Sequence, residues 1–471
     1  MTTRKRNRYR RVPDVVDPLS VVNRRAAGVD AHAKQHFVCV PADAVPAGFV
    51  NPDPLLPPFV RIFDTNTADL EAIAAWLRQC GVTSVAVEST GIYHLALVEV
   101  LEKHGIEVVI VDPRQTAHAP GRPKSDVLDC QWIQRLHSYG LLRASFRPGP
   151  EIRKLRSFER HREMLVRYAA SHVQHMQKAL EQMNCKLPEV VTDITGVTGM
   201  LIIKAILRGV RDPQQLAAYR HAACKSSVAE IAAALQGNWQ EEYLFDLRQA
   251  MKIWEEYRRR LKDCEDQIEA CLRQFPVKSA DKPLPPNPRA DRRGSRGKNA
   301  VHFDARELLF RMTGVDVTML EGIDQTTALV LVSELGFDLS KFPTERHFTS
   351  WLRLSPNHRG SAGRIKSRRT GHASSRASRA FQMAAAGCHH AKHAMGAFYR
   401  RIAARSSGAK AVVATARKIA ERYYRLMTKG GDYVRQAMGA YERTYQLKLT
   451  RGLAKRAAEL GYQLVPLTTS P

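Results

Sequence analysis

The chain has 471 residues, long enough for two or three domains, and 44% of them are hydrophobic, so most of it can fold. The longest apolar stretches, 200–206 and 328–332, are far short of a membrane span, and no apolar segment follows the basic N-terminus, so we expect neither a membrane protein nor a secreted one. The formal net charge is +27, and a basic protein of this size usually binds a polyanion, most often nucleic acid.

The eight cysteines are scattered along the chain, and no pair has the CxxC spacing of a zinc knuckle. Their spacing does not suggest a disulfide framework either. We therefore expect reduced thiols in a soluble, cytoplasmic protein.

The first predicted domain covers residues 24–150 and follows a basic arm at 1–23. In it, short β-branched runs alternate with helical segments. The runs are 37–40, 82–87 and 106–111, and the helices are 68–79 and 93–104. This alternation predicts an α/β domain with a mixed sheet.

Residues 151–275 are predicted to form mostly long helices. In the last of them, apolar residues recur in steps of three and four, as in the a/d seam of a coiled coil. The seam consists of Leu247, Ala250, Trp254, Tyr257, Leu261, Cys264, Ile268, Cys271 and Phe275. The alternative is an amphipathic helix packed on its own domain, but the wide charged face favours a protruding hairpin that drives self-association.

The second half of the chain is predicted to be a flexible linker, a basic helical domain and a short tail. Residues 276–304 are rich in Pro, Gly and charge, residues 305–460 are helical, and residues 461–471 are the tail. Residues 351–460 hold 24 Lys and Arg against four acidic residues, and 351–420 contain no acid at all. Because such a stretch would repel itself unless phosphates neutralised it, we expect nucleic-acid contact there.

Four acids of the first domain are candidate metal ligands. Asp30 follows the first apolar segment, Glu88 ends the run VTSVAVE at 82–88, and Asp126 and Asp129 share one face at the start of a helix. Acids that converge from strand ends and a helix could not all stay ionised without cations. Mg²⁺ prefers oxygen ligands, and two such ions about 4 Å apart can activate an attacking oxygen and stabilise a leaving one.

At these acids the sequence resembles a known family. The phrases GVDAHAK, VAVESTGIY and GRPKSDVLDCQWIQRLHSYGLL resemble the DEDD motifs of the insertion-sequence "one-ten" family of transposases, and LEGIDQTTALVLVSELG resembles part of their C-terminal domain. The resemblance implies an RNase H-like (RuvC-like) catalytic domain in which Asp30, Glu88, Asp126 and Asp129 bind Mg²⁺. It also implies donor and target DNA, a structured guide RNA, and a homo-oligomer, a dimer or tetramer, as partners.

The family's second catalytic element is a serine after a Leu-x-Pro segment. Here Leu354-Ser355-Pro356 is followed by RGSAGR at 359–364, so the resemblance implies Ser361 as nucleophile, with Ala362 where glycine is common. Small neighbours let a phosphodiester approach, and flanking cations can neutralise the pentacovalent phosphorus. The expected nucleic-acid contacts are Arg359, Arg364, Lys366, Arg368, Arg369, Arg376 and Arg379.

Two further motifs carry alternatives. Gly322-Ile323-Asp324 resembles a helix-hairpin-helix turn, which we expect to be structural first and a DNA contact second. His389 and His393 are expected on one helical face, where phosphate contact is favoured over zinc because no third ligand has fixed spacing.

The sequence therefore predicts a transposase that cleaves and rejoins DNA strands through Mg²⁺ and a serine. The alternative is a RuvC-like, metal-dependent, structure-specific endonuclease that uses water as nucleophile. A third possibility, a non-enzymatic nucleic-acid binder, is disfavoured by the four acids.

Overall fold

The computed structural model describes residues 20–89, 91–117, 125–279, 282–287, 297, 299–357, 359–361, 364–367, 370–371 and 375–465. The chain divides into two compact units, residues 1–147 and 148–471. Within the described residues, no helix combines the length and apolar character needed to cross a bilayer.

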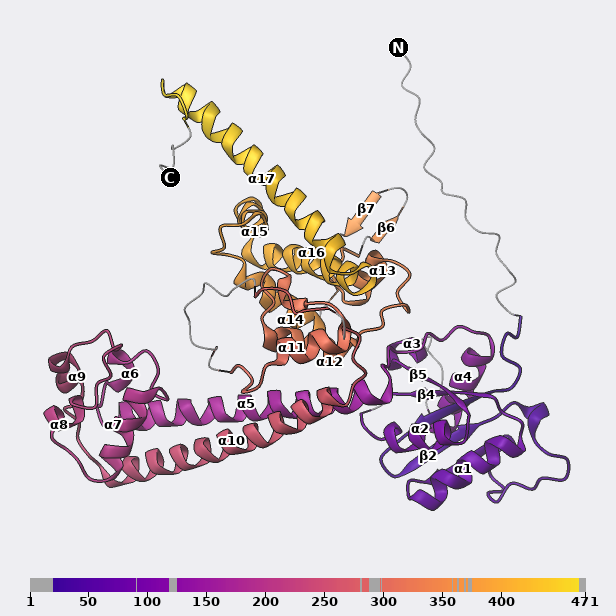
Figure 1. Ribbon diagram of the computed structural model, residues 1–471. Helices are drawn as coiled ribbons and strands as arrows, with labels where there is room; N and C mark the ends of the chain where they lie inside the picture. Colours follow the sequence, from indigo (N-terminus) through magenta and orange to yellow (C-terminus); the bar gives the residue numbers. More distant parts are fainter. Residues whose placement is uncertain are drawn as a thin grey trace, which may run out of the picture. The chain divides into compact units, whose positions relative to one another are not determined.

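The first unit is built on a five-stranded mixed sheet (Figure 1). The strands are β1 (Ala26–Ala31), β2 (Gln35–Cys39), β3 (Val60–Asp64), β4 (Ser84–Glu88) and β5 (Glu107–Val111). Their order is β3-β2-β1-β4-β5; β2 is antiparallel to β1 and β3, whereas β1, β4 and β5 are parallel. The mixed sheet expected from the sequence is confirmed.

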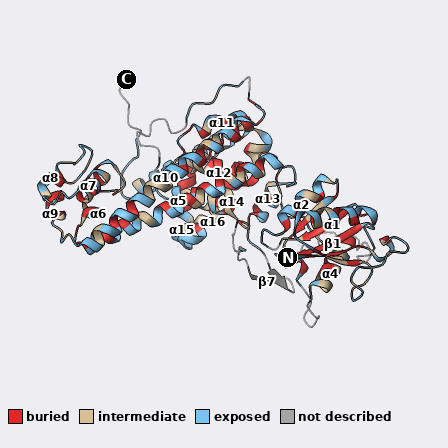
Figure 2. Cartoon of the chain, turned by 90° about the horizontal axis from the view of Figure 1, so that it is seen from below, coloured by how far each residue is buried: buried red, intermediate tan, exposed pale blue. Residues whose placement is uncertain are grey.

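Helices cover both faces of this sheet. They are α1 (Thr67–Gln79), α2 (His94–Lys103), α3 (Pro113–Thr116) and α4 (Asp126–Ser138), with a short 3-10 helix, η1 (Ala42–Ala44). The odd-numbered residues of β1 pack with α1 and α2 in one apolar core, whereas the even-numbered Gly28 faces α4. Because residues alternate across a strand, Asp30 lies on the α4 side with Gly28. Figure 2 shows buried residues both on the strands of the sheet and on the helices.

Gly28 lets α4 lie directly against β1. A Cβ at this position would be 2.2 Å from the backbone nitrogen of Gln134 and 2.6 Å from the carbonyl oxygen of Cys130. Backbone atoms cannot move aside as a side chain can, so only glycine permits this approach. The glycine of the GVDAHAK motif therefore sets the spacing between Asp30 and the start of α4.

The second unit contains an antiparallel hairpin of two long helices, α5 (Pro150–Gln182) and α10 (Glu241–Arg273). Cys264 of α10 lies against Phe158 of α5, and Tyr257 lies against Tyr168, so the two helices run in opposite directions. Short helices pack at one end of the hairpin (Figure 1). These are α6 (Leu187–Val190), α7 (Val197–Leu207), α8 (Pro213–Ala217) and α9 (Val228–Ala234).

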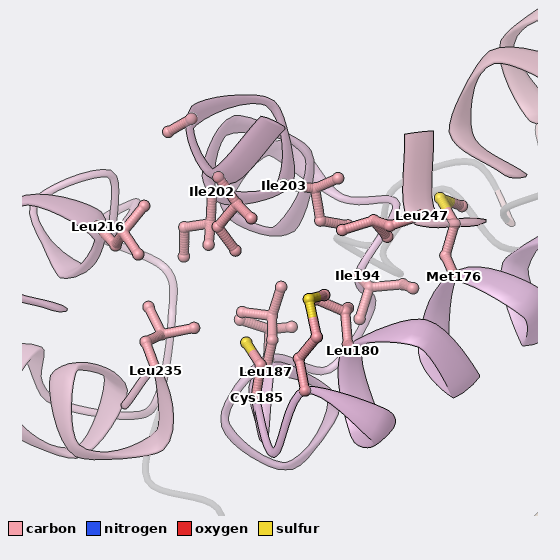
Figure 3. Close-up of a cluster of buried hydrophobic side chains, with 14 of the residues drawn as sticks. Met176, Leu180, Cys185, Leu187, Ile194, Ile202, Ile203, Leu216, Leu235 and Leu247 are labelled. Carbon is pink, nitrogen blue, oxygen red and sulfur yellow. The ribbon is translucent and has the colours of Figure 1, made fainter. Parts of the chain in front are cut away.

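The short helices share one apolar core with the hairpin. Figure 3 shows Ile202 and Ile203 of α7 with Leu247 of α10 and Met176 and Leu180 of α5. This core explains why the apolar run at 200–206 is a short buried helix rather than a membrane segment.

The predicted seam of α10 is covered within the chain. Seven of its nine residues are buried, Trp254 and Tyr257 are half-buried, and α5 lies along this face. Hence the seam is not available to bind a second copy of the chain. Self-association remains a prediction, but the seam of α10 does not support it. Most described residues of the predicted flexible linker are exposed, but its C-terminal end packs against the hairpin. Val301 is fully buried, and the Arg162 guanidinium donates to the carbonyl oxygen of Asn299 over 2.5 Å.

The described residues of the C-terminal part form helices and one small β-hairpin. The helices are α11 (Ala305–Thr313), α12 (Gln325–Leu335), α13 (Glu345–Trp351), α14 (Arg376–Gly387), α15 (Ala394–Arg405), α16 (Gly408–Lys429) and α17 (Gly431–Glu459), with a 3-10 helix, η2 (Val317–Met319). The strands are β6 (Arg359–Ser361) and β7 (Arg364–Ser367). Glu334 of α12 joins this part to the α5–α10 hairpin. Its carboxylate accepts hydrogen bonds from Nε and Nη2 of Arg160 on α5, at 2.7 and 2.8 Å.

The Gly322-Ile323-Asp324 turn lies directly before α12. Gly322 has a positive φ of 78°, and a Cβ there would be 2.1 Å from the carbonyl oxygen of Ala384, so the turn has a structural role; Asp324 caps α12. The expectation that His389 and His393 share a helical face is wrong. α14 ends at Gly387, and His393 instead caps the start of α15.

Candidate metal centre

Asp30 and Glu88 lie at the same edge of the sheet. Asp30 is the fifth of the six residues of β1, and Glu88 is the last residue of β4. These strands are adjacent and parallel, with Val29 paired to Val87, so their carboxyl ends meet. This edge is where open α/β sheets usually bind ligands.

Asp126 and Asp129 are brought to this edge by α4. Ser125 is the N-cap, and its hydroxyl accepts a hydrogen bond from the backbone N–H of Leu128 over 3.3 Å. The two acids therefore fall in the first helical turn and, three residues apart, on one side of it. The helix dipole favours negative charge at this end.

All four acids line one pocket of about 320 Å³. Asp30 is the most buried of the acids that contact one another here, with 5% of its surface exposed. Burial raises the pKa of Asp30 above its ordinary value of 3.8; contact with His32 opposes this shift, and the charges of Glu88 and Asp126 add to it. A cation in the pocket would favour the ionised carboxylate.

The four acids are not equally close to one another in the pocket. The ligand atoms of Asp30 and Asp126 lie with that of His32 inside a group whose members are within 4.8 Å of one another. Glu88 instead accepts a 2.5 Å hydrogen bond from the Thr116 hydroxyl. Asp129 lines the pocket outside this closest group. The carboxylate-rich donor set suits Mg²⁺ or a similar hard cation.

His32 is the site residue that the sequence reasoning missed. Its Nε2 lies 3.0 Å from Asp30 Oδ2 and 3.6 Å from Asp126 Oδ1. The signal was present in the sequence, because His32 is two residues beyond Asp30 and successive odd or even positions of a strand share a face.

Ser361 belongs to the second unit, at the end of β6. In the β6–β7 hairpin Ser361 pairs with Arg364, and Arg359 pairs with Ser367. The side chains of Arg359, Ser361 and Arg364 lie outside the described part of the structure, as do Arg368 and Arg369 entirely.

Three of the predicted phosphate-binding side chains are described, and they differ in exposure and in ion pairing. Lys366 and Arg379 are exposed. Arg376, at the start of α14, instead donates a hydrogen bond to Glu163 of α5. Part of its charge is therefore engaged inside the chain, and Arg379 is the better placed of the two for nucleic acid.

A second group of acids meets a histidine in the α10 region: Asp266, Glu269 and His302. Its charges already have fixed partners. Lys262 Nζ lies 3.1 Å from Asp266, and Arg273 Nη2 lies 2.5 Å from Glu269. The hydrogen bond from Lys262 lowers the pKa of Asp266, and His302 lowers it further. Sequence reasoning did not single out this group.

Comparison with protein families identifies the class of the chain. A model for DEDD domains of IS110 elements, described as a transposase, matches residues 27–185, and one described as the IS116/IS110/IS902 transposase family matches residues 316–400. Together with the five-stranded mixed sheet, these matches define a transposase with an RNase H-like α/β domain. A comparison with curated proteins gave no match.

The chain belongs to the IS110 family of transposases. The resemblance drawn from its motifs is confirmed. It is a DNA-processing enzyme, and DNA is its partner. Asp30, Glu88, Asp126 and Asp129 all fall within the DEDD match, whereas Ser361 falls within the second one.

Proposed function

We propose that this transposase cleaves and rejoins DNA strands with Mg²⁺ at Asp30, Glu88, Asp126 and Asp129 and with Ser361 as nucleophile. A structured RNA would direct it to donor and target DNA, and it would act as a homo-oligomer. The observation that carries the proposal is the gathering of all four DEDD acids around one pocket.

The acids have different tasks in this proposal. Asp30 and Asp126 are close enough to hold one ion between them. Glu88 lines the same pocket, and the hydrogen bond that it accepts from the Thr116 hydroxyl orients its carboxylate there. When bound, the divalent cation supplies Lewis-acid polarisation of the phosphodiester and offsets the repulsion among the acids.

The serine would take part in a covalent step. Its Oγ attacks phosphorus, a phosphoserine ester forms, the bond from phosphorus to one DNA oxygen breaks, and that oxygen takes up a proton. An isolated serine hydroxyl is a weak nucleophile, so it needs a base or a metal ion close by. Lys366 and Arg379, both exposed, supply positive charge for the phosphates.

A covalent-trapping assay tests this chemistry. The full-length protein is purified with its bound nucleic acid, and that RNA is sequenced. The protein–RNA complex is then given labelled DNA from the ends of its element, nicked to prevent rejoining. We expect a protein-linked label on a denaturing gel that is lost in Ser361→Ala and kept in Ser367→Ala, a matched change in the same hairpin.

Cleavage at the wild-type rate by Ser361→Ala, without a protein-linked label, would instead support a RuvC-like hydrolytic endonuclease that uses water. Light scattering of the same preparation tests the oligomer. A monomeric mass for the complex with RNA and DNA would contradict that part of the proposal.

A further inference from the structure

We infer that the imidazole of His32 is a nitrogen ligand of the divalent ion and that it makes the site favour a first-row transition ion such as Mn²⁺ over Mg²⁺. This inference rests on the metal site proposed above and adds one residue to it. The four acids of the DEDD set provide only oxygen ligands, so a nitrogen ligand changes the chemical character of the site.

The spacing of the side chains is that of ligands on one ion. Two ligands at neighbouring corners of an octahedron, with bonds of about 2.1 Å, lie about 3 Å apart. His32 Nε2 lies 3.0 Å from the nearer Asp30 oxygen and 3.6 Å from the nearer Asp126 oxygen. The three groups therefore need only small movements to share an ion.

The chain holds the His32 ring in place before any ion arrives. β1 ends at Ala31, and the backbone N–H of His32 donates to the carbonyl oxygen of Gln35 over 3.1 Å, which closes the turn into β2. The ring packs edge-to-face on Phe37, with ring centres 5.9 Å apart. Phe37 is the cross-strand partner of Asp30, so one strand pair positions both ligands.

The competing explanation is that His32 only donates a hydrogen bond that keeps two acids together. The second cluster shows such an arrangement: His302 uses Nδ1 on Glu265 and Nε2 on Asp266, each at 2.8 Å. Among the described residues, the contacts of the His32 ring nitrogens involve Nε2 alone. Nδ1 can then carry the ring proton while Nε2 offers its lone pair to an ion.

The His32 ring can be reached from solvent. The His32 side chain is 40% exposed and lines the pocket together with the acids. An ion can therefore reach Nε2 from solvent. Because Mg²⁺ prefers oxygen ligands and imidazole suits transition metals, His32 shifts the preference towards the latter.

Pulsed electron paramagnetic resonance of Mn²⁺ in the full-length protein tests this assignment. We expect the coupling of a directly bound ¹⁴N nucleus in the wild type and its loss in His32→Gln. His104→Gln is the matched control, because His104 is a partly exposed histidine of the same unit that contacts Glu71 and not the pocket. Labelling the wild-type histidines with ¹⁵N should replace the ¹⁴N signal, a readout that needs no variant to fold.

The affinities for Mn²⁺ and Mg²⁺ give a second, independent test of His32 as a ligand. In His32→Gln the preference for Mn²⁺ over Mg²⁺, taken as the ratio of their dissociation constants, should fall on the order of tenfold. A second outcome is that the wild type binds Mn²⁺ without nitrogen coupling and the Asp126→Asn variant loses this binding. That result would overturn the role of His32 and leave the metal site standing. Mn²⁺ binding that is unchanged in both Asp30→Asn and Asp126→Asn would overturn the metal site and this inference together.

Discussion

Among the residues that the structure describes, two groups of carboxylates gather around a histidine, one in each unit, and their surroundings are opposite. Around His302, Lys262 and Arg273 pair with the acids, and Arg162 pairs with the neighbouring Glu265 at 2.7 Å. Around His32, the basic group in ion-pair distance of Asp30 and Asp126 among the described residues is the histidine itself.

The two clusters differ in which groups neutralise the negative charge of their acids. Acids that already pair with Lys and Arg side chains have less need of an ion to neutralise them. Asp30 is buried beside other acids, and its pKa is raised as a result. The ionised form of Asp30 is therefore disfavoured in the protein alone, and a cation bound beside it would stabilise that form. Proximity of acids alone therefore does not identify a metal centre.

The largest contrast is expected in strand cleavage. Asp30→Asn and Asp126→Asn keep the shape of the side chain and remove its charge, so each should lower the cleavage rate roughly a thousandfold in the assay with labelled DNA. Asp266→Asn and Glu269→Gln, the same changes in the second cluster, should leave the rate within about twofold. Comparable losses in the two pairs would end the distinction between the clusters.

A second test moves the acids without changing them. Gly28→Ala places a Cβ against the backbone of α4 and should lower the free energy of unfolding by roughly 3 kcal/mol, because the helix must shift. Metal affinity should fall as well. Urea denaturation gives the first quantity and Mn²⁺ titration the second. Gly452→Ala, in α17 with nothing within 4 Å of its added methyl, is the control and should not destabilise the protein.

The third test concerns Glu159, a buried acid one turn before Arg162 on α5. Its Oε2 has no hydrogen-bond partner among the described residues. Burial raises the pKa of Glu159 to about 7, Glu163 and Glu334 add to the shift, and Arg162 and Arg376 oppose it. The proton is therefore held more tightly in the folded state than in the unfolded one.

A raised pKa means that Glu159 stabilises the fold most below its unfolded pKa of 4.5, and that this stabilisation is lost as the pH rises through about 7. Glu159→Gln removes the dependence. Its free energy of unfolding relative to wild type should be higher at pH 8 than at pH 5 by about 2 kcal/mol. Denaturant unfolding at both pH values measures this difference; an equal difference at the two pH values would show that the pKa of Glu159 is not raised in the folded protein.

The smallest effect is expected from single basic residues. Arg379→Ala should reduce the slope of log affinity for DNA against log salt by about 1, because one phosphate contact is lost. Arg376→Ala should change it less, since this side chain pairs with Glu163. Filter binding between low and moderate salt gives both slopes. Equal changes would mean that Arg376 leaves Glu163 when DNA binds.

Local patterns in the sequence predicted much of the first unit. Alternating β-branched runs placed β2, β4 and β5 to within a few residues, and the spacing of Asp126 and Asp129 placed them correctly in the first turn of a helix. β3 was missed because its five residues follow a Pro-rich stretch and mix charged and apolar side chains.

Long-range partners could not be predicted in the same way. The apolar stripe of α10 indicates that some helix covers it, but not that this helix is α5, roughly a hundred residues earlier in the chain. Likewise nothing local connects Arg376 to Glu163. His32 is a different case. Its spacing of two residues from Asp30 indicated that the two side chains share a face, but only carboxylates were considered as ligands.

One measurement locates the ion directly. Fe²⁺ replaces Mg²⁺ at carboxylate sites, and with ascorbate and peroxide it produces hydroxyl radicals that cut the nearest backbone. In the full-length protein we expect cuts around residues 30, 88 and 126–129, suppressed by excess Mg²⁺ and absent in Asp126→Asn. Cuts around 266–269 and 302 instead, with none at the first cluster, would contradict the metal centre proposed for this transposase.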